Sequence, residues 1–285
     1  MKYHIEPDTV QETLVIPLFA RLICTERFPA LFEDENARII CDSLDYDFSA
    51  KRKLMESPAG LFGALEAAQR QYDLMWEVKD YLKDHPCASV VNLGCGLDDT
   101  FARVNNGQCH GYNLDFADVI EIREKVLQKA DNEENIACDL NDVRWMDQID
   151  RSQGVVFFAA GVFYYFETVR VRALFHTMAE QFPGGVLVFD ACNARGAKMM
   201  RKTWLKQAGI RSVDTYFSTN GAQDLRDWSP SFANVSEKSY MRGYRDLMPS
   251  VSLFHRILIL FCDHAVKMKI IRIEFRQEES EDGTQ

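Results

Sequence analysis

Residues 90–100 read VVNLGCGLDDT, an apolar run that opens into a glycine turn with two carboxylates directly behind it. The pattern predicts the first strand of a nucleotide-type α/β sheet and the loop that leaves it. Gly94 and Gly96 suit a sharp turn because, without a Cβ atom, they can adopt positive φ and let a ligand lie against bare backbone. The stretch therefore predicts both the fold and the place of a ligand.

The two acidic residues indicate what kind of ligand the turn suits. A dinucleotide places its pyrophosphate on the backbone N–H groups behind such a turn, and the pattern G-x-G-x-x-G supplies a third glycine for close helix packing. Here Asp99 stands at the third glycine position and Asp98 precedes it. Both carboxylates suit the start of a helix, but they would repel a phosphate at the same place. The turn favours a cofactor without phosphate, such as the sulfonium cation S-adenosylmethionine (SAM).

The next two predicted strands also end near acidic residues. The strand over 109–114 is followed by Asp115, which lies 19 positions after Gly96. An acid at this place can accept hydrogen bonds from both ribose hydroxyls of NAD or of SAM, so it does not separate these cofactors. At the third strand tip, Asp139 could accept from the adenine amino group, with Leu140 against the ring.

Four ordered motifs carry a family resemblance. They are VVNLGCGLDDTFARV, YNLDFADVIEIR, ACDL and AAGVFYYF, and TLVIPLFAR near the start and VLVFDA after the fourth strand extend them. On these motifs the chain resembles the leucine carboxyl methyltransferase family, in particular its bacterial branch of polyketide O-methyltransferases. The resemblance implies a class I methyltransferase fold, SAM as cofactor, S-adenosylhomocysteine (SAH) as product and methyl transfer to oxygen.

The resemblance also implies which residues hold the cofactor. In the family an arginine on the helix before the first strand binds the SAM carboxylate. Arg70 is the arginine nearest that position, although Ala68 could occupy the slot and Arg70 could be an ordinary solvated charge. Arg123 matches a second arginine of the family pattern, and we expect a structural role for it. The expected cofactor-binding residues are Arg70, Asn92, Gly94, Cys95, Gly96, Leu114, Asp115, Asp139, Leu140, Ala160, Gly161 and Tyr165.

The fourth strand tip is where a methyl acceptor would meet the sulfonium. We identify Tyr164 and Tyr165 as candidates for positioning the acceptor, and no residue as a catalytic acid or base. Several family members carry a glutamate at the position of Ala160, so a polar contact expected there is missing. The aromatic cluster 163–166 could form a wall around a cation, or it could simply belong to the core.

No histidine is placed by a motif as a general base. His110 lies on a predicted strand, where a hydrogen-bonded core role is expected, and His176 lies within a helix. His255 and His264 could border an acceptor cleft. A carboxylate acceptor needs no base because its pKa is roughly 4, whereas a phenol or alcohol usually needs one.

Helices and strands alternate along the chain after a helical start. We predict a doubly wound, mostly parallel seven-stranded sheet, Rossmann-like, whose ligand lies at the carboxyl ends of the strands. The last two strands are expected to pair antiparallel at one edge, as the resemblance implies. Helices are predicted over 11–24, 36–44, 61–82 (one helix or two), 116–130, 141–149, 168–182 with Thr168 as cap, 195–208, 222–228 and 251–264, and further strands over 154–160, 186–190, 232–240 and 268–275.

Length, charge and cysteine spacing restrict the class of protein. With 285 residues the chain can form one domain, with 1–84 as helical cap and lead-in, 85–276 as α/β core with substrate-side insertions and 277–285 as a disordered tail. A net charge of −10 argues against a nucleic-acid or anionic-membrane surface. The eight cysteines show no C-x-x-C spacing, which favours free thiols in a reducing cytoplasm over disulfides or a zinc site.

Three functions stay open at this point. The first is a SAM-dependent O-methyltransferase that acts on a carboxylate or hydroxyl of a small molecule. The second is a non-catalytic SAM-binding protein, favoured by the missing glutamate at Ala160. The third is an NAD-dependent oxidoreductase, which Asp98 and Asp99 disfavour. The sequence indicates neither the acceptor nor the oligomeric state.

Overall fold

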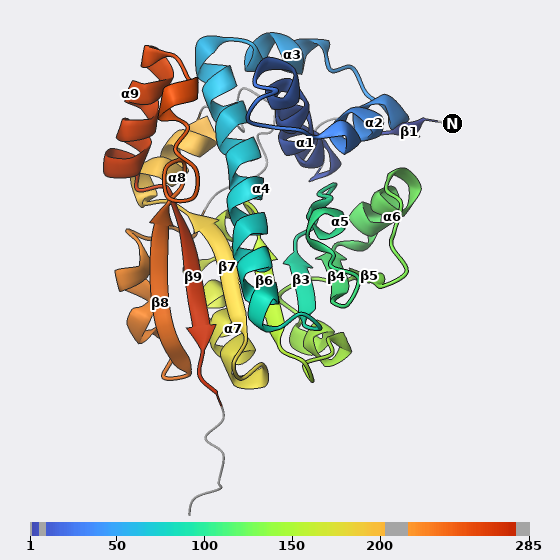
Figure 1. The fold of residues 1–285 in the computed structure, drawn as a ribbon, viewed down its shortest axis with the longest axis vertical. Coiled ribbons are helices and arrows are strands. Elements are labelled where there is room, and N and C mark those ends of the chain that lie inside the picture. Colours follow the sequence, from blue (N-terminus) through green and yellow to red (C-terminus); the bar gives the residue numbers. More distant parts are fainter. Residues whose placement is uncertain (1, 6–9, 203–215, 278–285) are drawn as a thin grey trace, which may run out of the picture.

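The computed structural model describes residues 2–5, 10–202 and 216–277, and its centre is a seven-stranded sheet (Figure 1). The strand order is β5-β4-β3-β6-β7-β9-β8, and only β9 runs antiparallel to its neighbours. This confirms the predicted mostly parallel, doubly wound sheet and the antiparallel pairing of the last two strands. The strands are β3 (Ser89–Leu93), β4 (His110–Asp115), β5 (Glu133–Ala137), β6 (Val155–Ala159), β7 (Val186–Ala191), β8 (Phe232–Ser239) and β9 (Lys269–Phe275).

The strands are buried on both faces, and their side chains alternate between two core layers. On β6, Val156 and Phe158 pack in the layer of α4 (Pro58–Asp84), whereas Phe157 packs in the layer of α7 (Thr168–Gln181). Figure 1 shows α4 crossing the front of the sheet and α7 behind it. A strand between two helical layers needs an apolar side chain at every position, which explains the unalternated run VVFFA.

The long helix α4 joins the helical start of the chain to the sheet. Ser57 begins it, since its hydroxyl accepts a hydrogen bond from Gly60 N at 3.1 Å and Pro58 occupies the first turn. Further along, the Glu77 carboxylate accepts from Lys238 Nζ on β8 and Arg272 Nη1 on β9, both at 2.8 Å. The segment predicted as one helix or two is therefore a single helix fixed to the far edge of the sheet.

The remaining helices surround this frame. Figure 1 places α1, α2 and α3 above the strand ends on one side, and α8 and α9 above them on the other. These helices are α1 (Val10–Arg27), α2 (Glu35–Ser43), α3 (Ser49–Met55), α5 (Thr100–Val104), α6 (Ala117–Val126), α8 (Ala194–Met200) and α9 (Leu253–Phe261), with 3-10 turns η1 (Val143–Gln148), η2 (Phe163–Tyr165), η4 (Ala222–Trp228) and η5 (Met248–Ser250), and a π turn η6 (Cys262–Val266). In the described part of the chain, no helix combines the length and apolar character needed to cross a membrane.

Several predicted elements need correction. Thr168 is the first residue of α7 rather than its cap, and the capping position belongs to Glu167, which makes no side-chain cap bond. The helix predicted over 141–149 is the 3-10 turn η1. The short helix α3 and the two-residue pair β1 (Tyr3–His4) with β2 (Leu44–Asp45) were not predicted. The predicted helix over 195–208 is described only to 202, and the predicted tail after 277 lies outside the described residues.

Candidate functional site

The glycine turn after β3 adopts the predicted backbone. Gly94 and Gly96 have φ values of 65° and 49°, in the left-handed region that favours glycine. A Cβ on Gly94 would lie 2.6 Å from Val162 Cγ2, so a side chain at this position would also clash. The Asp115 carboxylate at the tip of β4 accepts a hydrogen bond from Gly96 N at 2.8 Å. The first two strand tips are thus joined directly.

Arg123 holds the same turn from α6. Its Nη1 donates to the carbonyl oxygens of Gly96 at 3.2 Å and of Asp98 at 2.5 Å, and its Nη2 contacts the Glu133 carboxylate at 3.4 Å. The side chain is buried. These contacts give Arg123 the structural role that we expected.

Asp99 does not direct its charge into the turn. The residue is 3% exposed, and its carboxylate binds Arg103 Nε at 3.0 Å and Asn36 Nδ2 at 2.7 Å. Although burial alone would raise the pKa of Asp99, Arg21 and Arg103 lower it below the usual range. Asp99 therefore presents no unpaired charge to the turn, and the prediction that carboxylates here repel a phosphate now depends on Asp98. Asp98 accepts from Thr100 N at 2.5 Å, in a turn that starts α5.

The adenine-side residues are placed differently from one another. Asp139 is exposed two residues beyond β5, and its Oδ1 accepts from Asn141 N at 2.9 Å. Leu140 is buried in the core layer of α7 rather than open to a ligand. Burial raises the pKa of Asp115, although Gly96 N and Phe116 N donate to its carboxylate. Phe116, which follows Asp115, is 47% exposed, a large apolar surface that our site prediction did not include.

Arg70 lies at the tips of β6 and β7, within a buried polar cluster. Its Nη1 is 3.2 Å from Asp190 Oδ2, and Tyr164 OH donates to the same oxygen at 3.1 Å. Gly161 N donates to the other Asp190 oxygen at 2.5 Å. Burial works to lower the pKa of Arg70, but Asp190 and the nearby tyrosines raise it overall. Arg70 is therefore a paired, permanently charged group at the strand tips and not a solvated surface residue.

The backbone at Gly161 lies close to this guanidinium. Its φ is 74°, and a Cβ at this position would lie 2.5 Å from Arg70 Nη1. Ala160, beside it, has no charge to offer, but Asp190 on the neighbouring strand supplies an acid at the same edge. Sequence reasoning missed Asp190, although the motif VLVFDA contains it. A carboxylate that ends a fully apolar strand was the available signal.

The aromatic residues after β6 divide between core and surface. Phe163 packs edge-on against Phe175 and Phe189, with ring centroids 4.8 and 5.3 Å apart, so it belongs to the core. Tyr164 is buried on Asp190, whereas Tyr165 is 38% exposed. Within the cluster 163–166, Tyr165 is therefore the most open ring, whereas the Tyr164 hydroxyl is bound to Asp190.

Asn92 and Cys95 line the turn from inside. Both are nearly inaccessible, at 1% and 2% exposure. Among the described residues, the Asn92 amide nitrogen has no hydrogen-bond partner, which is unusual for a buried polar group. Burial raises the pKa of the Cys95 thiol, so it stays protonated and does not act as a nucleophile. All eight cysteines are free, as predicted.

The histidines do not meet at the strand tips. His255 Nε2 contacts the carbonyl oxygen of Pro58 at 3.1 Å, and His176 Nδ1 contacts Ser229 Oγ at 2.8 Å. His110 lies 3.1 Å from Glu134 and is half-buried rather than a core residue, and His264 is exposed. In the described part of the chain, no group of three or more His, Cys, Asp or Glu side chains is arranged to hold a metal ion.

The assembled residues fit the groups that SAM presents. Arg70 beside the bare backbone of Gly161 suits a carboxylate, because a guanidinium binds carboxylates with two parallel hydrogen bonds. Asp115, held at the glycine turn, suits a ribose diol. The unpartnered Asn92 amide lies on the strand between them in the sheet order.

Comparisons with known proteins agree with this arrangement. The tetracenomycin polyketide synthesis O-methyltransferase TcmP from Streptomyces glaucescens is 26% identical over 183 residues, which cover 64% of this chain and 66% of that protein, just under two thirds of its length. A candidate methyltransferase from Thermobifida fusca YX superimposes with a TM-score of 0.58 at 13% identity, over 82% of this chain and 90% of its own. A DUF574 family protein from Streptomyces avermitilis MA-4680 gives 0.59 at 11% identity, over 84% and 95%. These two structures show that the fold is shared.

The match to a family profile covers more than half of the chain. The profile of leucine carboxyl methyltransferases matches residues 15–179, from α1 through the glycine turn and the tip of β6 into α7. The chain therefore belongs to the leucine carboxyl methyltransferase family, whose members are methyltransferases that use S-adenosylmethionine.

Proposed function

We propose that the protein transfers a methyl group from SAM to an oxygen atom of a small molecule. The observation that carries this proposal is the buried cluster at the tips of β6 and β7, where Arg70, Asp190 and Gly161 are held together next to the glycine turn. The O-methyltransferase TcmP, similar over residues that include part of this site, supports oxygen as the acceptor atom.

Each end of the site has its own task in this proposal. Arg70 binds the carboxylate of the cofactor, and Asp190 keeps the guanidinium in place by accepting a hydrogen bond from its Nη1 at 3.2 Å. Asp115 accepts from the ribose hydroxyls, and Asp139 from the adenine amino group. The exposed ring of Phe116, rather than the buried Leu140, then covers the adenine face. Asn92, Gly94, Cys95, Gly96, Leu114, Ala160 and Tyr165 complete the set of cofactor contacts that we propose.

The chain contributes mainly by positioning. SAM supplies an activated methyl group on a sulfonium, and its displacement by oxygen needs the reacting atoms aligned at about 3 to 3.5 Å. Arg70 and Asp115 fix the two ends of the cofactor, so the strand tip at 160–165 can present its backbone and Tyr165 to the acceptor. Exclusion of water by the buried Tyr164 and Phe163 strengthens the electrostatic contacts that remain.

The alternatives make different predictions for ligand binding. Because the charge of Asp99 is matched, only Asp98 still argues against the phosphates of NAD. Arg70 at the strand tips favours SAM, because SAM carries a free carboxylate that Arg70 can bind and NAD carries none. The missing glutamate at Ala160 is compensated by Asp190, which weakens the case for a non-catalytic SAM-binding protein. The free thiols agree with a cytoplasmic location, which we also propose.

Calorimetric titration of the full chain with SAM, SAH and NAD tests the proposal. We expect SAM and SAH to bind in the micromolar range and NAD not to bind. Asp115→Asn should abolish binding, whereas Asp131→Asn, an exposed carboxylate, should leave it unchanged. Binding of NAD alone would establish the oxidoreductase. SAM binding without methyl transfer to any oxygen acceptor would favour the non-catalytic protein.

A further inference from the structure

A second carboxylate lies near Arg70 and takes no part in the pair with Asp190. Glu66 precedes Arg70 by one turn on α4, so both side chains leave the same side of the helix, about 6 Å apart along its axis. Figure 1 shows that α4 begins among the cap helices and then crosses the sheet. Glu66 precedes Arg70 in the chain, so it lies nearer the cap end of this helix.

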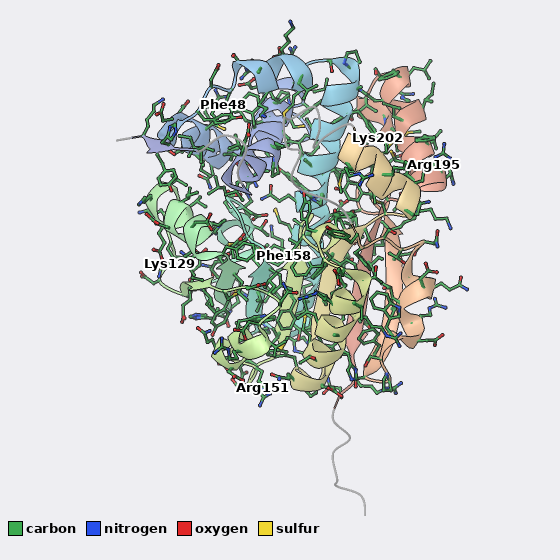
Figure 2. All side chains as sticks on the ribbon, turned by 180° about the vertical axis from the view of Figure 1, so that it is seen from behind. Phe48, Lys129, Arg151, Phe158, Arg195 and Lys202 are labelled. Atoms are coloured by element: carbon green, nitrogen blue, oxygen red, sulfur yellow. The ribbon has the colours of Figure 1, made fainter. Side chains whose placement is uncertain are left out.

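The surroundings of Glu66 come from the end of the chain that follows β7. Tyr240, buried directly after β8, donates its hydroxyl to the Glu66 carbonyl oxygen at 3.0 Å. The Cys262 thiol at the start of η6 hydrogen-bonds the Glu66 carboxylate. Figure 2 shows Arg195 and Lys202 at this same end of the molecule, opposite Arg151. Glu66 is thus half-buried, against segments that come after β7 in the chain.

One oxygen of this carboxylate has no hydrogen-bond donor. Glu66 Oε1 is excluded from solvent, and no residue that the structure describes donates to it. An ionised oxygen left alone in the interior is costly, and native proteins rarely keep one without a reason. A hydroxyl group of a bound molecule would satisfy this oxygen.

Among the residues that the structure describes, four polar groups face Glu66 and influence its protonation. They are Arg70 on its own helix, Cys262 on η6, Cys192 after β7 and Tyr240 after β8. Burial raises the pKa of Glu66 to about 7, although Cys262 and Arg70 act to lower it. Asp190 already matches the charge of Arg70. The Glu66 carboxyl therefore exchanges its proton near neutral pH, as an effective general base must.

Three titratable groups near Arg70 are unsuited to take a proton, namely Asp190, Tyr164 and Tyr240. Asp190 accepts hydrogen bonds from Arg70, Tyr164 and Gly161 N, so both of its oxygens are occupied. Burial raises the pKa of Tyr164 and Tyr240 well above the ordinary value, and both phenols stay protonated.

We propose that Glu66 is the general base of the methyl transfer and that the acceptor is therefore a hydroxyl group, an inference that rests on the proposed function. The acceptor proton moves to Glu66 Oε1 while the acceptor oxygen forms the new bond to the methyl carbon. The carbon–sulfur bond breaks, its electron pair stays on sulfur, and Glu66 later releases the proton to water. A carboxylate acceptor has no proton to give, and the ionised Glu66 would repel it.

Methyl transfer to a matched pair of probes tests the acceptor class. With labelled SAM, the wild type should methylate 2-naphthol and not 2-naphthoic acid. Glu66→Gln should reduce the rate on 2-naphthol by about 10²- to 10⁴-fold, the usual contribution of a general base. Its dissociation constant for SAH should stay within twofold, and Glu66→Asp should restore part of the rate. The exposed Glu124→Gln on α6 is the control and should match the wild type.

Infrared difference spectroscopy of the SAH complex needs no turnover and tests Glu66 directly. A protonated carboxyl band should disappear as the pH rises through about 7 and should be missing in Glu66→Gln. Absence of this band in the wild type, methylation of the carboxylic acid alone, or an undiminished rate in Glu66→Gln would each overturn the proposal. If SAM and SAH do not bind at all, the proposed function fails instead, whatever the infrared titration of Glu66 shows.

Discussion

Substitution of Gly161 by alanine tests the role of Arg70, provided that the effect of backbone strain is measured separately at a second glycine. A Cβ at this position would lie 2.5 Å from Arg70 Nη1, so the guanidinium must move away from Asp190. Gly107→Ala is a matched control, because Gly107 has nearly the same backbone, φ 78° against 74°, and nothing within 4 Å of the added Cβ. The two variants therefore share the strain and differ in the displaced arginine.

The expected magnitudes follow from these two contacts. A left-handed conformation costs an alanine about 1 to 2 kcal/mol, so both variants should lose roughly that much in free energy of unfolding. Separating a buried ion pair costs about 3 to 5 kcal/mol. Since Asp190 keeps its bonds to Tyr164 and Gly161 N and the Arg70 side chain is 17% exposed, we expect about half of that in addition for Gly161→Ala.

The decisive assay is SAH binding by calorimetry, beside urea unfolding. A hydrogen bond to a charged group contributes about 1.5 to 3 kcal/mol, so displacement of Arg70 should weaken SAH binding about 10- to 150-fold in Gly161→Ala. Gly107→Ala should bind SAH as the wild type does. Equal affinity of the two variants would refute the assignment of Arg70 to the cofactor carboxylate.

Three further predictions concern charge. The pKa of Glu66 rises from 4.5 in the unfolded chain to about 7 in the fold. Because the unfolded chain loses this proton at a lower pH, the free energy of unfolding falls as the pH increases between these values. Glu66→Gln should thus be more stable to urea than the wild type at pH 8, by up to about 3 kcal/mol, and equal near pH 4; a constant difference would contradict this. Burial raises the pKa of Asp115, so SAH affinity should fall on acidification through that pKa, and affinity that is flat with pH would exclude the ionised form as the ligand. Arg103→Ala should cost about 3 kcal/mol in urea unfolding because Asp99 stays buried, whereas Arg144→Ala, at an exposed pair, should leave the free energy of unfolding nearly unchanged. Similar costs for the two variants would disprove the role of burial.

The strand tips of the cofactor half were predictable because their signals are local. An apolar run, a turn with two glycines and an acid after the next strand lie within 26 residues, from 90 to 115, and each has a direct backbone reason. Gly94, Gly96 and Asp115 therefore lie where the sequence indicated. The mostly parallel sheet followed from the same alternation of strands and helices, whereas the order of its strands did not.

The rest of the site depends on contacts between distant parts of the chain. Arg70 and Asp190 are 120 positions apart, and no periodicity shows that α4 brings one to the strand that carries the other. The surroundings of Asp99 come partly from distant segments as well, since Arg21 on α1 and Asn36 on α2 contribute to them beside the local partner Arg103. The environment of Glu66 requires Tyr240 and Cys262, which lie after the last predicted motif. Sequence patterns indicate which groups are polar, but only the fold decides which of them are matched.

The continuity of α4 has a consequence for how this chain can change length. The helix carries Glu66, Arg70 and Glu77 on one rigid axis, and Asp190 and Arg272 hold two of them against different strands. One residue inserted between Arg70 and Glu77 would rotate everything before it by about 100° and move it by about 1.5 Å. Arg70 and Glu77 could then not both meet their strands. Insertions and deletions should therefore be tolerated in the surface loops and rejected within this helix.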